Sequence, residues 1–406
     1  MRIYFHIDVG MLPFEQLAIL KKLESEVLKH TSSRQLCISL AFATASALLP
    51  IGSAYAQSSV TLFGLISTGI EYTNNTGGHS QWQMASGPEQ LPRFGLLGRE
   101  DLGGGTAAIF RLENGFNSTT GALGQGGRMF GRTAYVGLAN DHYGTITLGR
   151  QLEEMANQLY WSESAVQFAA FSTHIGDNDN IFNSLRFNNS VRYQSPNIHG
   201  LTFAGSFALS NMAGGFSAND GYSFGGNYAR GNLKIGAAFT QFNHPDLASN
   251  LNGAVDDDTF GFSNPFAKSL TGALTEQQRI FGVAAAYDFR VVQVSAVYTN
   301  VLYNYADSTG VRLQNAEVSV TKHVTPALLL GLGYMFTAGN YSTNSQPRYH
   351  GVNTGAVYSL SKRTDLWIVG MYQHAAGDAQ HAQIYTTTAS STSSQVSVVA
   401  GIRTRF

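Results

Sequence analysis

The final stretch of the chain, Ser394 to Phe406, alternates between apolar and polar positions. Counting every second residue back from Phe406 collects Thr404, Ile402, Ala400, Val398 and Val396 on one face. Arg403 and Arg405 lie on the other face. This period of two predicts a β-strand whose apolar face meets lipid and whose polar face lines a lumen. We therefore expect an N-terminal strand to pair with this one and close the sheet.

The same alternation recurs along the chain and predicts sixteen strands. They are expected at 58–72, 91–100, 105–116, 128–138, 143–150, 187–195, 200–211, 221–230, 233–243, 279–288, 291–303, 311–322, 327–337, 347–360, 365–375 and 394–406. The connections alternate between short turns and long loops, and the long ones are 73–90, 117–127, 151–186, 212–220, 244–278, 304–310, 338–346 and 376–393. This asymmetry favours an all-β fold, an up-and-down antiparallel transmembrane β-barrel with both termini on the short-turn, periplasmic side.

Composition supports a barrel over a helical membrane protein. Charged residues make up 13% of the chain, about half of the roughly 25% found in soluble domains. Beyond the N-terminal region, no segment approaches the roughly 18 consecutive apolar residues of a spanning helix. The formal net charge of −1 gives no electrostatic argument for a nucleic-acid partner.

The N-terminal region has the pattern of a secretory signal. Residues 36–51 are apolar, Lys29 and Arg34 precede them, and Ala54-Tyr55-Ala56 follows as a cleavage site. We expect residues 1–56 to be removed and residues 57–406 to form the barrel. An anchoring helix is the alternative, but about 16 apolar residues is short for a membrane span. The single cysteine, Cys37, lies in the removed part, so no disulfide is expected.

Several motifs resemble the general diffusion porins of Gram-negative bacteria, of the Burkholderia and Neisseria type. They include RFGLLGREDLGGG from 93, GRMFGRTAYVGL from 127, GTITLGRQ from 144, GDNDN from 176, RFNNSVRYQSPN from 186 and AGIRTRF from 400. The resemblance implies a sixteen-stranded barrel with an infolded constriction loop. It also implies a homotrimer in the outer membrane, among lipid and lipopolysaccharide, that passes small hydrophilic solutes and ions by passive diffusion.

Four arginines are candidates for a basic wall at the constriction. The resemblance places Arg93, Arg132 and Arg186 there by motif, and Arg111 alternates with apolar neighbours so that it also points inward. A charge facing lipid near mid-bilayer costs about 2 to 4 kcal/mol, which favours lumen positions. Ser67 stands where many relatives have aspartate, so ion preference is not carried over from the family. We instead expect a weak anion preference from the arginines themselves.

The loop at 151–186 is far longer than an ordinary connection, which is typical of a functional loop. Family resemblance sets acidic residues of this loop against the basic wall, and the candidates are Glu163, Asp177 and Asp179. An alternative role for Asp177 and Asp179 is to turn the chain back into the following strand.

Other classes of function find less support. An outer-membrane lipase or protease would need a nucleophile or paired acids with a histidine, and no such cluster is indicated, so an enzyme is not expected. The histidines show no paired-ligand spacing, and no metal or cofactor is predicted. A substrate-specific channel for a sugar or an anionic solute is the main alternative to a general pore.

Overall fold

The computed structural model describes residues 58–406 except 170, 246–249, 251 and 258–263. The predicted signal segment, residues 1–56, lies outside the described residues. No described helix is both long enough and apolar enough to cross a membrane.

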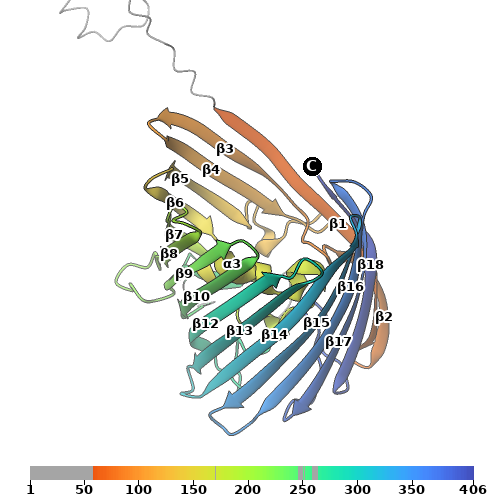
Figure 1. Ribbon diagram of the computed structural model, residues 1–406. Coiled ribbons are helices and arrows are strands. Elements are labelled where there is room, and N and C mark those ends of the chain that lie inside the picture. The colour runs from red at the N-terminus through yellow and green to blue at the C-terminus, as the bar shows by residue number, and fades with distance from the viewer. Residues whose placement is uncertain (1–57, 170, 246–249, 251, 258–263) are drawn as a thin grey trace, which may run out of the picture. The chain divides into compact units, whose positions relative to one another are not determined.

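The described chain is dominated by antiparallel strands (Figure 1). The first nine are β1 (Ser59–Thr76), β2 (His79–Ser86), β3 (Arg93–Gly103), β4 (Thr106–Gly115), β5 (Thr133–Asn140), β6 (Gly144–Gln151), β7 (Leu185–Gln194), β8 (Leu201–Ala208) and β9 (Gly221–Arg230). The others are β10 (Leu233–Asn243), β11 (Val255–Asp257), β12 (Thr275–Asp288), β13 (Gln293–Tyr305), β14 (Gly310–Thr325), β15 (Leu328–Tyr341), β16 (Pro347–Ser359), β17 (Thr364–Gly377) and β18 (Ser394–Arg405).

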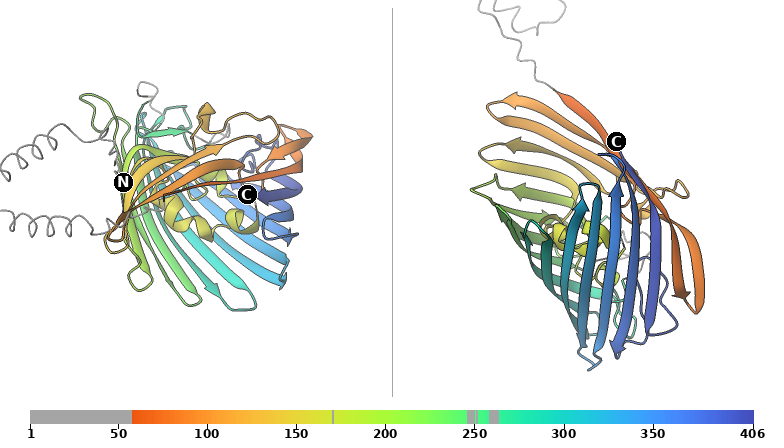
Figure 2. Two further views of the ribbon diagram at one scale, coloured as in Figure 1. Left: turned by 90° about the horizontal axis from the view of Figure 1, so that it is seen from above. Right: turned by 45° about the vertical axis from the view of Figure 1, so that its right-hand side comes forward.

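These strands form one closed barrel with sixteen wall positions. β2 and β3 pair with successive parts of the long strand β1, so together they occupy one position. β11 is a short strand that pairs with β7. Each remaining strand pairs with the next along the chain. The sheet closes between β1 and β18, with Leu65 opposite Arg405 and Thr73 opposite Ser397, as the sequence predicted (Figure 2).

One predicted loop is wrong. The sequence suggested a long connection at 73–90, but β1 continues to Thr76 and turns at Gly77 and Gly78 into β2. Both glycines have positive φ, of 64° and 102°, which a tight hairpin requires and most other residues resist. β2 does alternate, with Trp82 and Met84 exposed on one face, but it is only eight residues long.

The predicted division into lipid and lumen faces is confirmed. On β1, Val60, Leu62 and Ile70 expose more than half of their surface, whereas Ser67 and Glu71 are buried on the inner side. A continuous outer wall of exposed apolar side chains is unfavourable in water and favourable in lipid, so this surface is that of a barrel embedded in a bilayer.

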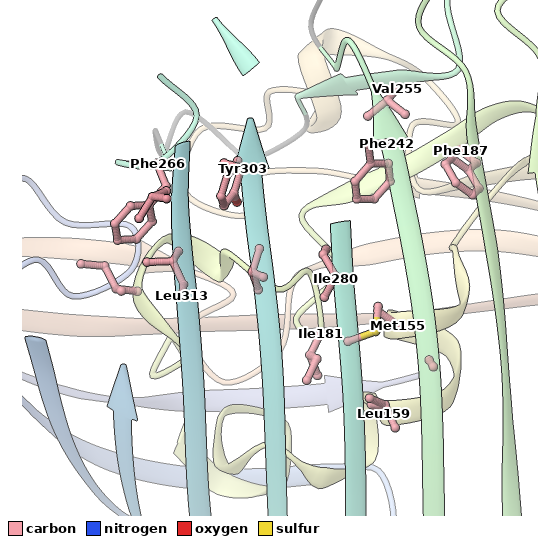
Figure 3. Packing of buried hydrophobic residues seen from close by; sticks show 14 of the residues in the cluster. Met155, Leu159, Ile181, Phe187, Phe242, Val255, Phe266, Ile280, Tyr303 and Leu313 are labelled. Atoms are coloured by element: carbon pink, nitrogen blue, oxygen red, sulfur yellow. The ribbon is translucent and has the colours of Figure 1, made fainter. Parts of the chain in front are cut away.

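The apolar core lies inside the barrel, where the loop after β6 packs against the wall. Its single α-helix, α3 (Glu154–Leu159), buries Met155 and Leu159. Figure 3 shows both side chains with Ile181 of the same loop beside wall residues such as Phe242 and Ile280. The loop therefore folds into the bore, as the resemblance to the family implied.

Candidate functional site in the pore

A cluster of basic side chains lines the inner wall over β3 to β7. Its centre is Glu113 on β4, which is buried, forms ion pairs with three arginines and accepts hydrogen bonds from two of them, Arg111 and Arg132. Arg132 Nε lies 2.6 Å from Glu113 Oε1, and Arg93 Nη1 lies 3.6 Å from the same oxygen. Arg111, two residues before Glu113 on the same strand face, contacts its other oxygen. One carboxylate thus holds three guanidinium groups in place and compensates only one of their charges.

Two further arginines extend this cluster along β7. Arg186 is fully buried and donates from Nε to the carbonyl oxygen of Arg132 at 3.0 Å and from Nη2 to Asn183 Oδ1 at 2.7 Å. Arg192 forms an ion pair with Glu154 of α3 at 2.7 Å. The contact between Arg192 and Glu154 joins the start of the infolded loop to the basic wall.

Between this wall and α3 lies a cavity of about 330 Å³. Five arginines and one glutamate line it, together with neutral residues from wall and loop: Arg93, Arg111, Arg132, Arg186, Arg192, Glu113, Gln90, Thr133, Tyr135, Gln151, Leu152, Ala156, Asn157, Tyr160 and Asn183. The loop side of the cavity is formed by apolar, amide and phenol groups. An anion in this space would meet donors from the wall and no carboxylate from the loop.

The acidic residues predicted to oppose the arginines lie elsewhere. Glu163, Asp177 and Asp179 are buried in the loop, and none of them lines the cavity. These three acids therefore do not oppose the arginines as expected, and the loop acid that does contact a wall arginine is Glu154, through Arg192. The reason is that the loop turns these carboxylates toward donors in its own backbone and on the distant wall.

The structure agrees better with the alternative role of Asp177 and Asp179, which is to turn the chain back into the following strand. Asp177 accepts from the backbone N–H groups of Phe182 and Ser184, at 3.0 and 2.9 Å, and so fixes the turn that leads into β7. Asp179 accepts from Thr299 on β13 at 2.6 Å and contacts His174 Nδ1 at 2.8 Å. Glu163 accepts from Thr173 at 2.8 Å. These contacts hold the loop's shape and position.

The helix α3 is held by Glu153, which caps its N-terminus. The Glu153 carboxylate accepts from the backbone N–H groups of Met155 and Ala156 and contacts Thr240 of β10. Because Glu153 is fully buried, burial raises the pKa of its carboxyl to about 7, although the hydrogen bonds act in the opposite direction. This single side chain couples the helix cap to the barrel wall.

Glycines of the inner wall make room for the loop. A Cβ atom on Gly331 or Gly355 would collide with Phe168, whose ring lies directly on the strand backbone. A Cβ on Gly282 would lie 2.6 Å from Met155. The absence of side chains at these positions lets the loop approach the far wall closely, which leaves space on the arginine side.

Two members of the cluster were missed by sequence reasoning, namely Glu113 and Arg192. Glu113 falls on the lumen face of β4 two residues after Arg111, and Arg192 falls on the lumen face of β7 in the motif that begins at Arg186. Strand alternation could have found both. Their partners come from other strands or from α3, which no local pattern indicates.

The comparisons with known proteins agree with this architecture. The profile of the Gram-negative porin family matches residues 41–380. The chain is 29% identical over 367 residues to an outer membrane porin protein of Bordetella pertussis, covering 79% of this chain and 90% of that one.

Solved structures share the fold. An anion-selective porin from Comamonas acidovorans superposes with a TM-score of 0.69 at 22% identity, over 86% of this chain and 100% of that one. The trimer form of OmpT, an outer membrane protein of Vibrio cholerae, gives a TM-score of 0.63 at 13% identity, over 86% and 99%. The chain therefore belongs to the Gram-negative porin family and forms a channel for passive diffusion in the outer membrane.

Proposed function

We propose that this porin is a general diffusion pore with a weak preference for anions, and that the arginine cluster over β3 to β7 sets that preference. The observation that carries the proposal is the lining of the cavity, five arginines against one glutamate. The mature chain need not be positive overall for this to hold. Charge at a narrow section acts through a low-dielectric wall and is screened less than charge at a wide mouth.

The proposal extends to which atoms meet a permeating anion. Arg111 keeps about a third of its side chain exposed, whereas Arg132 and Arg186 are almost completely enclosed. Arg111 and Arg93 would contact the solute directly, and the enclosed pair would contribute through the field. Small hydrophilic solutes and ions are the expected permeants, and they would cross by passive diffusion without an enzymatic step.

We also propose a homotrimer, embedded among outer-membrane lipid and lipopolysaccharide, with residues 1–56 removed as a secretory signal and both termini periplasmic. The trimeric form of the related Vibrio cholerae structure supports the oligomeric state. Crosslinking in mild detergent and unheated gels should show three chains, and a monomer under both conditions would refute this part.

Single-channel recording under a salt gradient tests the anion preference. The zero-current potential should have the sign that indicates anion selectivity, and the conductance should rise with salt concentration without a plateau. A zero-current potential of the opposite sign, which indicates cation selectivity, would reject the proposal. Current that saturates on adding a sugar or an organic anion would instead identify a substrate-specific channel.

A further inference from the structure

A second cluster of ionisable groups lies on the opposite side of the loop from the arginines. Glu163 and His174 come from the loop, and Glu317 comes from β14 on the far wall. All three are buried, with no more than 2% of their surface exposed. Each offers one potential ligand atom, and these atoms all lie within 4.8 Å of one another. The cluster therefore joins the middle of the constriction loop to the barrel.

The hydrogen bonds of His174 prepare one of its nitrogens as a metal ligand. Nδ1 lies 2.8 Å from Asp179 Oδ2, so a proton on Nδ1 is donated to that carboxylate. Asp179 is itself fixed by Thr299 at 2.6 Å. A carboxylate on one imidazole nitrogen fixes the tautomer, orients the ring and leaves a lone pair on the other, an arrangement found around metal-binding histidines.

One atom of each residue is completely buried without a hydrogen-bond partner, namely His174 Nε2, Glu163 Oε2 and Glu317 Oε2. The other oxygen of Glu163, Oε1, lies 3.5 Å from His174 Nδ1. Nε2 and Glu317 Oε2 are 3.5 Å apart, too far for a good hydrogen bond. A tetrahedral zinc ion, with ligand bonds of about 2.0 to 2.2 Å, holds neighbouring ligand atoms roughly 3.4 Å apart.

The cluster is also rich in acidic groups. Glu163 has Asp177, Asp179 and Glu317 as its charged neighbours besides His174. Asp179 Oδ2 lies 2.8 Å from one imidazole nitrogen, and Glu317 Oε2 lies 3.5 Å from the other. One imidazole among several carboxylates is a donor set that suits a divalent cation.

We propose that Glu163, His174 and Glu317 bind a divalent transition-metal ion, of which zinc is the best match to one imidazole and two carboxylates, and that this ion fastens the constriction loop to β14. The site is structural and separate from the arginine-lined cavity. Glu163 and His174 supply ligand atoms from the constriction loop, and Glu317 supplies one from β14 in the wall. Asp179 is a positioning residue that sets the tautomer of His174.

Because the ligands are enclosed, the ion enters while the loop folds and leaves only when the barrel opens. The test uses the whole protein, isolated from outer membranes of cells grown with added zinc and washed with EDTA in detergent. Elemental analysis should give close to one zinc per chain, retained until the barrel is unfolded by heat. Zinc on exposed histidines, such as His79 and His142, would be stripped by the wash.

Three variants locate the ion. His174→Gln and Glu317→Gln should lower the zinc content at least fivefold. Glu71→Gln should leave it unchanged, because Glu71 is a buried wall carboxylate of β1 that bonds Gln83 and Ser397. Folding of each variant is checked by its heat-dependent shift on gels.

The outcomes are decisive in both directions. Folded wild-type protein with less than about a tenth of an equivalent of zinc would overturn the proposal, as would equal zinc in Glu317→Gln and Glu71→Gln. If a variant does not fold, X-ray absorption on the wild type decides. A zinc shell of nitrogen and oxygen that includes one imidazole supports the site, and a shell with several imidazoles refutes it.

Discussion

The two sides of the bore differ in what their buried polar groups do. On the side formed by β3 to β7, five arginines line the cavity and Glu113 is the one carboxylate in the lining. On the side formed by β13 to β16, polar groups of the wall form hydrogen bonds with polar groups of the loop. Asn178 is bonded by Asn315 at 2.8 Å, and Ser164 by Glu317 and Asn353 at 2.6 and 2.8 Å. The loop is fastened to one wall so that the opposite, charged wall remains accessible.

This difference explains how one loop can narrow a pore without closing it. Hydrogen bonds in a water-poor interface are strongly directional, and a donor left without its acceptor there is costly. The loop therefore has one preferred position against the far wall. Arg132 and Arg186 are held by Glu113 and by the backbone of the wall, and Arg192 is the lining arginine that pairs with an acid of the loop, Glu154.

Removing the middle of the loop should have the largest effect. Deleting residues 160–175 takes away the segment between α3 and the final turn, and conductance should rise by at least about twofold, since the narrowest section limits ion flow. Planar-bilayer recording measures this. An unchanged conductance in a correctly folded variant would mean that the loop does not narrow the conducting path.

Neutralising the charged side should change selectivity more than conductance. Arg93→Ala with Arg132→Ala removes two of the five lining arginines. The zero-current potential in a tenfold salt gradient should move toward cation preference by on the order of 10 mV, where perfect selectivity gives about 59 mV.

The matched control for this pair changes two arginines on exposed turns. Arg290→Ala with Arg363→Ala removes the same formal charge, but both residues lie in turns between strands. Its potential should remain close to that of the wild type at high salt, because exposed charges are screened within a Debye length. Equal shifts in both double variants would show that net charge, and not the cluster, sets selectivity.

The single lining carboxylate should act in the opposite direction. Glu113→Gln leaves Arg93, Arg111 and Arg132 without their shared acid. The potential should move toward anion preference by about 5 mV, less than for the arginine pair because only one charge changes. Glu71→Gln is the matched control, because it removes a buried carboxylate that does not line the cavity. A shift toward cation preference in Glu113→Gln would mean that the arginines lose their positions without it.

The smallest expected effect concerns pH and the helix cap. Glu153 has a folded-state pKa of about 7 against an ordinary 4.5. A raised carboxyl pKa means that the folded state keeps a proton which the unfolded chain releases, so this group's contribution to stability falls as pH rises from about 4.5 to 7.

The difference of roughly 2.5 pH units corresponds to at most about 3 kcal/mol of unfolding free energy. In Glu153→Gln this pH dependence should disappear, whatever the absolute stability of the variant. Thermal unfolding of wild type and variant between pH 4.5 and 8 measures the two slopes. Parallel slopes would show that Glu153 does not titrate in this range.

Local pattern determined the wall of this protein. A period of two fixes which side of each strand faces lipid, because one step of register would move every apolar side chain into the lumen. For this reason the strand positions and the closure of β1 on β18 could be predicted. Alternation also predicted that Arg111 points inward, whereas Arg93, Arg132 and Arg186 were assigned from motifs that resemble the family. The hairpin after β1 was missed, because β2 is short and its apolar face consists mainly of Trp82 and Met84.

Only the tertiary structure decided what the loop's ionisable groups do. The sequence places Glu163 and His174 in one loop and Glu317 far along the chain. No spacing rule links them, and their contact exists because the loop folds across the bore onto β14. The same folding turns Glu163, Asp177 and Asp179 away from the arginines. Strand periodicity specifies a side chain's face, whereas the partner across a barrel depends on how the whole sheet closes.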